Sequence, residues 1–386
     1  MTEAFVYLDY AASTPVDPRV RDRMREAGEM TCANPSSTHA AGRLTHGIIA
    51  TAAAQLAGLL NAGPRTLVWT SGATESDNLA IAGGARYRAR RGRHVVTMKT
   101  EHKAVTDVFE QLAKEGFDVS WVEPDGNGIL DPAAFEAVLR EDTQLASIML
   151  VNNETGVIQD IEALGGICRE RGILFHVDAA QAAGKVHIDL STLPVDLMSV
   201  TAHKFYGPQG IGALYIADRP GCHVDPILFG GGQQRRIRPG TLPMELIAGF
   251  GMAAEIAAHR IDDDLEHLRV LRDALWDGIR DLGGIRRNGD PDGFPGILNV
   301  SAAGVEGESL LLALEPLQVA TGSACNSKSR EPSSVLRALG LSDTDAQSAI
   351  RFSVGRPTTA GEVSFAADRY RQAVLKLRGL APGAGA

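Results

Sequence analysis

Cysteine is scarce in this chain, and blocks of basic charge and long apolar runs are missing. The 386 residues include four cysteines, Cys32, Cys168, Cys222 and Cys325, and no two of them have the Cys-x-x-Cys spacing. This absence argues against structural zinc and thioredoxin-like sites, and we expect no metal site. The net charge is −9 without a basic block, which argues against a nucleic-acid partner.

Targeting and membrane-spanning signals are also missing. Residues 1–5 lack the basic start and apolar run of a signal peptide, and no apolar stretch is long enough to span a bilayer. We therefore expect no membrane association and a cytoplasmic, reducing location, which would keep Cys325 out of disulfides.

Strand-like segments alternate with helical patterns through the first two thirds of the chain. This alternation predicts an α/β fold with a mostly parallel, seven-stranded sheet covered by helices on both faces. At 386 residues with 44% hydrophobic content, two domains are expected, a large one over 15–260 and a smaller α+β one over 261–386. A helical region over 243–282 would join them. The predicted strands are 66–70, 94–98, 119–122, 146–151, 174–178, 197–201 and 213–216.

One lysine follows a strand-like run near the middle of the chain. Lys204 has no acidic neighbour nearer than Asp196 and is followed by Phe205, Tyr206 and a Gly-Pro turn. A partly desolvated lysine can act as a nucleophilic amine, as a Schiff base to pyridoxal phosphate (PLP) requires. The alternative is a lysine that caps a strand end, the commoner case. The residues upstream decide between the two.

An aspartate ends the preceding strand. In open α/β sheets ligands bind at the carboxyl ends of strands, where Asp178 would lie. A PLP enzyme needs a carboxylate against the pyridine nitrogen, because the protonated ring acts as an electron sink. Asp178 fits that role, and Gln181 can reach the phenolic oxygen of the ring. An aspartate after a strand is by itself more often a helix N-cap, but its pairing with Lys204 favours the cofactor hypothesis.

A turn of small residues follows the first predicted strand. Ser71, Gly72, Ala73 and Thr74 precede a helical pattern over 79–90. Backbone N–H groups of such a turn, the positive end of the helix and the Thr74 hydroxyl would hold a phosphate. The alternative is an ordinary capped helix. Neither a P-loop nor a dinucleotide-binding fingerprint is present.

Cys325 has the most reactive surroundings of the four cysteines. It lies in the small, polar, basic-flanked stretch 321–330, a predicted loop in which a thiolate would be favoured. Cys168 lies in the helical pattern over 162–171 and is expected to be a buried apolar residue. An exposed loop cysteine can also be incidental, so the residues alone leave the role of Cys325 open.

Taken together, these segments resemble the cysteine desulfurases of the aminotransferase class V family, in the NifS/IscS-type branch that supplies sulfur for iron–sulfur clusters. The resemblance covers almost the whole chain, and so many ordered motifs exclude a chance match. Besides Asp178 and Lys204, it includes 8–12 (LDYAA), 34–39 (NPSSTH), 70–76 (TSGATES), 100–105 (TEHKAV), 151–156 (VNNETG), 238–241 (RPGT), 322–325 (GSAC) and 351–353 (RFS).

The resemblance implies PLP fold type I, with residues 1–14 packed on the small domain. Lys204 would carry the cofactor, Asp178 would pair with the pyridine nitrogen and His102 would stack on the ring. Asn153 and Gln181 would contact ring substituents or the substrate. The phosphate would be held by Ala73, Thr74, Thr201 and His203.

The resemblance also implies a homodimer and a substrate clamp. Thr241 would reach the phosphate of the neighbouring subunit, and Arg351 would bind the substrate carboxylate, a task suited to a planar guanidinium. Without the resemblance, His102 would be interpreted as a packed histidine and Arg351 as part of a surface ion pair.

The implied reaction converts L-cysteine to L-alanine. Lys204 would remove the Cα proton, Cys325 would take the sulfur as a persulfide, and His102 would shuttle protons. A sulfur acceptor or iron–sulfur scaffold protein is expected as partner. The alternatives are a selenocysteine lyase, a plain class V aminotransferase, and a non-enzymatic adaptor that has kept the fold; retention of Lys204, Asp178, His102 and Cys325 argues against the last.

Overall fold

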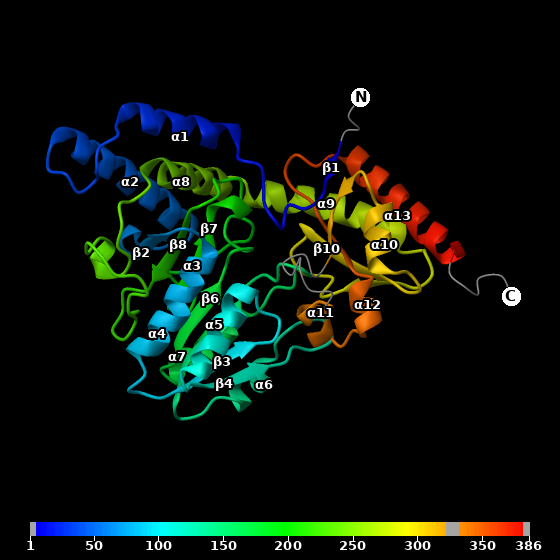
Figure 1. The fold of residues 1–386 in the computed structure, drawn as a ribbon, viewed down its shortest axis with the longest axis horizontal. Helices are drawn as coiled ribbons and strands as arrows, with labels where there is room; N and C mark the ends of the chain where they lie inside the picture. Colours follow the sequence, from blue (N-terminus) through cyan, green and yellow to red (C-terminus); the bar gives the residue numbers. More distant parts are fainter. Residues whose placement is uncertain (1–4, 322–331, 381–386) are drawn as a thin grey trace.

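A seven-stranded sheet forms the centre of the larger part of the molecule (Figure 1). The computed structural model describes residues 5–321 and 332–380. The strand order is β2-β8-β7-β6-β5-β3-β4, in which β8 runs antiparallel to β2 and β7 and all other neighbours are parallel. The prediction of a mostly parallel seven-stranded sheet is therefore confirmed. The strands are β2 (Leu67–Thr70), β3 (His94–Met98), β4 (Asp118–Val122), β5 (Thr143–Met149), β6 (Leu174–Asp178), β7 (Leu197–Thr201) and β8 (Gly212–Ile216).

Helices cover both faces of this sheet, which is why its inner strands are apolar on both sides. In β6, Leu174 packs into the core on one face, and Phe175 and Val177 pack into the core on the other. Cys168 lies in that second core and is fully buried, as expected. The first face is covered by α3 (Ala73–Asn78), η2 (Leu79–Gly83), α4 (Gly84–Tyr87) and α5 (Lys103–Lys114). Residues of α1 (Pro18–Met30), α2 (Ala40–Leu59), α6 (Pro132–Ala137), α7 (Ile161–Glu170) and α8 (Met244–Ala258) belong to the second core.

The helix after β2 begins earlier than its sequence pattern predicts. It starts at Ala73, where the N–H of Ser76 donates to the carbonyl of Gly72 at 3.1 Å, and it continues through the π-helical turn η2 into α4. The prediction of a helix over 79–90 was therefore wrong at its start. The apolar pattern marks only the part of the helix that packs on the sheet. The polar first turn faces a cavity.

A second, antiparallel sheet lies in the C-terminal part of the chain (Figure 1). Its order is β12-β13-β10-β9, and the ring of Phe352 packs at 5.7 Å from the ring of Tyr370 beneath it. Its strands are β9 (Ile285–Asn288), β10 (Ile297–Ala302), β12 (Ala320–Thr321) and β13 (Ile350–Ser353). The helices of this part are α9 (Ile261–Ile279), α10 (Gly307–Ala313), α11 (Ser334–Ala338), α12 (Asp343–Gln347) and α13 (Ala360–Leu380).

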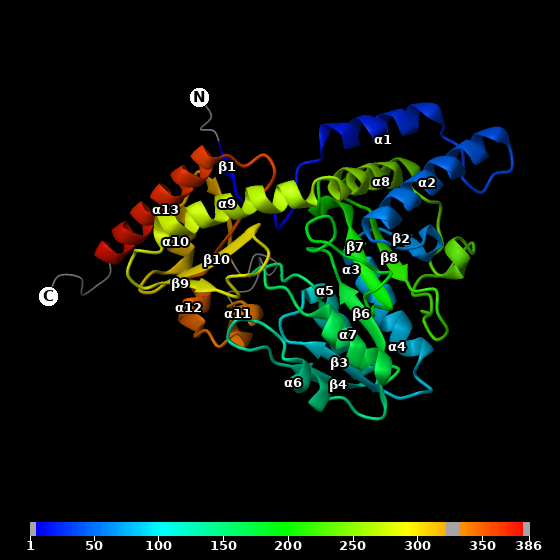
Figure 2. The same ribbon diagram turned by 180° about the vertical axis from the view of Figure 1, so that it is seen from behind.

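Two segments connect the sheets. The predicted helical region over 243–282 is two helices, because α8 ends at Ala258 and α9 begins at Ile261; Figure 2 shows them running from one part to the other. The N-terminal segment also connects the two parts, running from the C-terminal part toward the seven-stranded sheet. Its strand β1 (Val6–Tyr7) pairs with β11 (Leu317–Gln318), and Asp9 forms a bridge with Ser353. The domain boundary at residue 260 stays a prediction.

Among the described residues, no helix combines the length and the apolar character that crossing a membrane requires.

Candidate active site

A cavity of about 670 Å³ lies at the carboxyl ends of the parallel strands. Met149, Asp178 and Thr201, the last residues of β5, β6 and β7, all line it. In a parallel sheet these ends share one edge, so side chains far apart in sequence meet there. The cavity brings together ten of the predicted site residues, namely Ala73, Thr74, His102, Asn153, Asp178, Gln181, Thr201, His203, Lys204 and Arg351.

Asp178 is buried at the end of β6. Its Oδ1 accepts a hydrogen bond from the N–H of Ala180 at 2.8 Å, and a turn rather than a helix follows, so the helix N-cap alternative is wrong. Burial raises the pKa of Asp178, while the bond from Ala180 and the charges of His102 and Lys204 act in the opposite direction. The carboxylate therefore needs a cationic partner to be stable in this position.

Asp77 is a second buried carboxyl beside Asp178. Within the described residues its two carboxylate oxygens have no hydrogen-bond partner, and Oδ1 lies 3.6 Å from Nε2 of His176. Burial, and then the charge of Asp178, raise the pKa of Asp77 well above its ordinary value. Two carboxyls in such surroundings favour a positive charge in the cavity next to them.

Lys204 ends the short helix η3 (Ala202–Lys204) that follows β7. Its Nζ donates hydrogen bonds to the carbonyl oxygens of Ala11 at 2.6 Å and Ala12 at 2.9 Å. The N-terminal segment thus holds the ammonium at the edge of the cavity. Lys204 lies inside a ligand-sized space, which favours the chemical interpretation over a strand-end cap.

His102 forms the N-terminal cap of α5 and lines the same cavity. Its Nδ1 accepts a hydrogen bond from the N–H of Ala104 at 3.1 Å, and the residue lines the cavity together with Asp178 and Lys204. Burial, followed by the charge of Lys204, lowers the pKa of His102, while Asp178 raises it. The ring is therefore neutral near pH 7, and because Nδ1 accepts from Ala104, the ring proton lies on Nε2, from which it can be donated.

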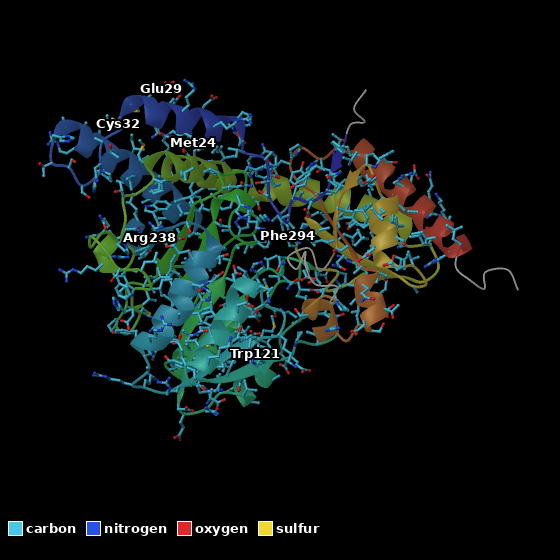
Figure 3. The ribbon with its side chains drawn as sticks, in the orientation of Figure 1. Met24, Glu29, Cys32, Trp121, Arg238 and Phe294 are labelled. Carbon is cyan, nitrogen blue, oxygen red and sulfur yellow. The ribbon has the colours of Figure 1, made fainter. Side chains whose placement is uncertain are left out.

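The predicted phosphate cradle lies where β2 passes into α3. Ala73 and Thr74 open the helix, and Glu75 fixes the turn, because its carboxylate accepts hydrogen bonds from the N–H of Ser71 at 2.7 Å and from Nε of Arg238 at 2.8 Å. Arg238 is labelled in Figure 3. The positive end of the helix therefore faces the cavity.

Thr201 and His203 line the cavity after β7. Nδ1 of His203 lies 3.2 Å from Oγ of Ser13. Burial, and then the charges of Lys204 and Lys185, lower the pKa of His203 to about 4, so the ring is neutral and can act as a hydrogen-bond donor.

Arg351 is buried on β13 rather than part of a surface ion pair. Its Nη1 donates to the carbonyl oxygen of Asn153 at 2.8 Å, and its Nη2 donates to Oδ1 of Asp9 at 2.7 Å. The Nε of Arg351 and the Oδ1 of Asn153 have no partner within the described residues. Unpaired buried polar atoms are costly unless a ligand completes their hydrogen bonds.

Gln181 reaches the cavity from the turn after β6. Its Nε2 donates to the carbonyl oxygen of Ala11 at 2.6 Å, and its Oε1 accepts from Nζ of Lys185 at 2.6 Å. Because an ammonium offers only donors, Lys185 fixes which end of the amide faces away from it. Nζ of Lys185 also lies 5.6 Å from the ring centroid of Phe294, labelled in Figure 3.

Two predicted site residues are not among the described residues that line this cavity. Thr241 lines a separate groove of about 480 Å³ together with Cys32, which lies in the segment between α1 and α2 (Figure 3). Thr241 has to lie outside the cavity of its own chain if it contacts the cofactor phosphate of a neighbouring subunit. That contact stays a prediction. Cys325 lies outside the described residues, so its place relative to Lys204 stays a prediction as well.

Sequence reasoning missed three titratable residues, Asp9 and Asp77, which line the cavity, and Lys185, which contacts Gln181 beside it. Asp9 belongs to the recognised 8–12 motif, and Asp77 directly follows the recognised 70–76 motif, so both positions could have been flagged. Lys185 lies four residues after Gln181, a spacing that carries no signal when, as here, the segment forms turns.

Sequence and structure comparisons identify the family to which the chain belongs. The profile of the family described as aminotransferase class-V matches residues 6–365. The chain belongs to this family. Among class-V proteins, "Cysteine desulfurase IscS" of Vibrio vulnificus (strain YJ016) is 53% identical over 381 residues, which cover 98% of this chain and 94% of that protein.

Solved structures of similar class-V proteins superimpose on nearly the whole chain. A "NifS-like protein" has a TM-score of 0.89 with 34% identity, covering 97% of this chain and 100% of the other. "SspA in complex with cysteine" has a TM-score of 0.82 with 35% identity, covering 90% and 98%. The chain is thus a cysteine desulfurase of the NifS/IscS type, and the resemblance read from the motifs is confirmed.

Class-V aminotransferases and cysteine desulfurases are PLP-dependent in general, and the cavity fits that group. A lysine, an aspartate, a helix start and a ring to stack on meet in a space of about 670 Å³. The buried carboxyls of Asp77 and Asp178 suit a protonated pyridine nitrogen, and the start of α3 suits a phosphate.

Proposed function

We propose that this chain converts L-cysteine to L-alanine with PLP and transfers the sulfur to Cys325. The observation that carries the proposal is the meeting of Lys204, Asp178, His102 and Arg351, from four different elements, in one cavity. The printed names of the relatives, cysteine desulfurases and a protein in complex with cysteine, support the same substrate.

In this proposal each side chain has one task. PLP, when bound, supplies an electron sink for the pair of electrons left on the substrate Cα. Lys204 would hold the cofactor, and its amine would remove the Cα proton of the substrate. Asp178 keeps the ring nitrogen charged, and His102 stacks on the ring and moves a proton to or from the thiol. Arg351 binds the substrate carboxylate, with Asn153 beside it.

The remaining cofactor contacts are proposed at both ends of the ring. The N–H groups of Ala73 and Thr74, with Thr201 and His203, would hold the phosphate, and Gln181 would donate to the phenolic oxygen. Thr241 would complete the phosphate site of the partner in a homodimer.

In the proposed sulfur transfer, Cys325 takes the sulfur atom from the substrate. The Cys325 thiolate attacks the substrate sulfur, the Cβ–S bond breaks, and its electron pair stays on the substrate carbon, which takes up a proton on the way to alanine. Cys325 then carries a persulfide. A thiol reductant or a sulfur-acceptor protein, which we propose serves iron–sulfur cluster assembly, removes it.

The test is product release from the PLP-loaded enzyme. With L-cysteine and a thiol reductant, sulfide and L-alanine should form in equal amounts. A rate with L-selenocysteine that stays high in Cys325→Ala would favour a selenocysteine lyase instead. Amino-group transfer to a 2-oxo acid without sulfide would favour a plain aminotransferase.

A further inference from the structure

The substrate-binding guanidinium of the proposed function already holds a carboxylate of the chain itself. Nη2 of Arg351 lies 2.7 Å from Oδ1 of Asp9, which lies 342 positions earlier in sequence. The Arg351 side chain is 6% exposed and the Asp9 side chain 23%, and both residues line the cavity. The pair is therefore part of the site and not of the outer surface.

Backbone hydrogen bonds hold Asp9 in place, which restricts where its carboxylate can lie. The carbonyl of Asp9 accepts hydrogen bonds from the N–H of Ala12 at 3.0 Å and from the Tyr7 hydroxyl at 3.1 Å. Asp9 also forms a bridge with Ser353 on the same strand as Arg351. Among the residues that the structure describes, the carboxylate is hydrogen-bonded to Arg351 alone.

An incoming α-carboxylate cannot use Arg351 fully while Asp9 stays in place. A carboxylate is bound best by two parallel N–H groups of one guanidinium. Nη1 is engaged by the carbonyl of Asn153, and Nη2 by Asp9. Nε has no partner within the described residues, but a carboxylate that binds Nε and Nη2 side by side meets Asp9 at Nη2. Two carboxylates at one arginine would also repel each other in partly buried surroundings.

We propose that Asp9 occupies the carboxylate position of Arg351 in the resting enzyme and that the substrate carboxylate displaces it. The proposal rests on the proposed function of Arg351. It makes Asp9 a specificity-determining residue, because an amine without a carboxylate cannot exchange for Asp9. The affinity for an amino acid then depends on how much more strongly Arg351 binds the substrate carboxylate than it binds Asp9.

Asp9→Asn tests the competition. The amide keeps an oxygen that can accept from Arg351 but removes the charge. The probes are L-alanine and L-alaninamide, which differ in the carboxylate, and binding to the PLP-loaded enzyme is followed by its visible spectrum. Asp9→Asn should bind L-alanine about five- to tenfold more tightly than wild type, a modest effect for a partly exposed charge. L-Alaninamide should bind both proteins within about twofold.

Controls separate this inference from the proposed function. Asp22→Asn removes an exposed charge of the same segment outside the cavity and should leave L-alanine affinity unchanged. Arg351→Met should weaken L-alanine, and Asp9→Asn should have no further effect in that background. If Arg351→Met bound L-alanine like wild type, the role of Arg351 in the proposed function would be wrong.

A different result for Asp9→Asn would overturn the proposal. If Arg351 matters but Asp9→Asn binds L-alanine no more tightly than wild type, Asp9 positions the guanidinium and does not compete. Asp9→Ser, whose short side chain cannot hold Arg351 in the same way, provides a second variant if Asp9→Asn unfolds. Asp9→Ser should also bind L-alanine, but not L-alaninamide, more tightly than wild type. If Asp9→Ser bound L-alanine no more tightly, the proposal would be overturned as well.

Discussion

The Nζ of Lys204 lies 2.6 Å from the carbonyl oxygen of Ala11, across 193 positions of sequence. The same oxygen also accepts a hydrogen bond from Nε2 of Gln181, and the segment that supplies it supplies Asp9 to Arg351. A short N-terminal stretch thus contacts the proposed cofactor lysine and the proposed substrate arginine together. It links the C-terminal sheet to the edge of the seven-stranded sheet.

Lys204→Ala should abolish covalent capture of PLP. Borohydride reduction of wild type should add one cofactor mass per chain, because the amine of Lys204 carries the cofactor. The matched control is Lys185→Met, which removes a second lysine, the one that donates to Gln181, and should still be labelled. Mass spectrometry of the reduced proteins distinguishes the two, and label retained in Lys204→Ala would mean that another lysine is used.

Asp178→Asn should leave PLP bound but slow removal of the Cα proton by a factor of about 10² or more, because the ring nitrogen loses its counter-charge. Exchange of the Cα hydrogen of L-alanine with heavy water reports that step without sulfur chemistry. Asp107→Asn, an exposed aspartate on α5, is the control. Exchange at the wild-type rate in Asp178→Asn would remove it from this role.

His102 should set the acid limb of the pH profile. Burial and Lys204 lower its pKa, so kcat/KM for L-cysteine should fall with a midpoint below the ordinary histidine value of 6.5. His102→Asn keeps a good helix cap for α5 while removing the ring. This variant should lose that limb and about 10²-fold in rate. A limb unchanged in His102→Asn would assign the titration to another group.

Glu154 should make stability depend on pH. Burial raises its pKa to about 7, although the Ser333 hydroxyl at 2.5 Å and the charge of Arg351 favour the carboxylate. The protonated form is favoured in the fold, so its stabilising contribution is present below the unfolded pKa of about 4.5 and is lost as the pH rises through 7.

Glu154→Gln does not titrate and avoids this loss. Between pH 5 and pH 8 its free energy of unfolding, measured with denaturant, should rise by about 2 kcal/mol relative to wild type. Glu170→Gln, at an exposed position on α7, should show no such change. A constant difference between Glu154→Gln and wild type at all pH values would show that the carboxyl is ionised throughout.

Local pattern and sheet geometry together predict part of this site. Asp178 and Lys204 follow consecutive buried strands, and parallel neighbours bring such residues to one edge, so their meeting follows from the topology. Thr74 follows β2 closely, as predicted, but it lies in the first turn of α3 and not in a turn before the helix. Its helix was expected too late, because the first turn of that helix is polar and lacks the apolar period.

The rest of the site depends on contacts that no local pattern encodes. Asp9 meets Arg351 only because β1 pairs with β11 and the N-terminal segment then crosses to the other sheet. The break between α8 and α9 falls at His259 and Arg260. Neither residue is a proline or a glycine, so no helix-breaking residue marks the break in the sequence. Tertiary packing rather than propensity determines both features.

Persulfide formation on Cys325 tests the central claim most directly. The PLP-loaded enzyme is given a short pulse of L-cysteine without reductant, its thiols are alkylated, and its peptides are analysed by mass. About one equivalent of L-alanine per active chain should appear, with one extra sulfur on Cys325 and none on Cys32, Cys168 or Cys222. Cys325→Ala should bind PLP and L-cysteine but release no appreciable alanine. Undiminished alanine release from Cys325→Ala, or sulfur on another cysteine, would contradict the account.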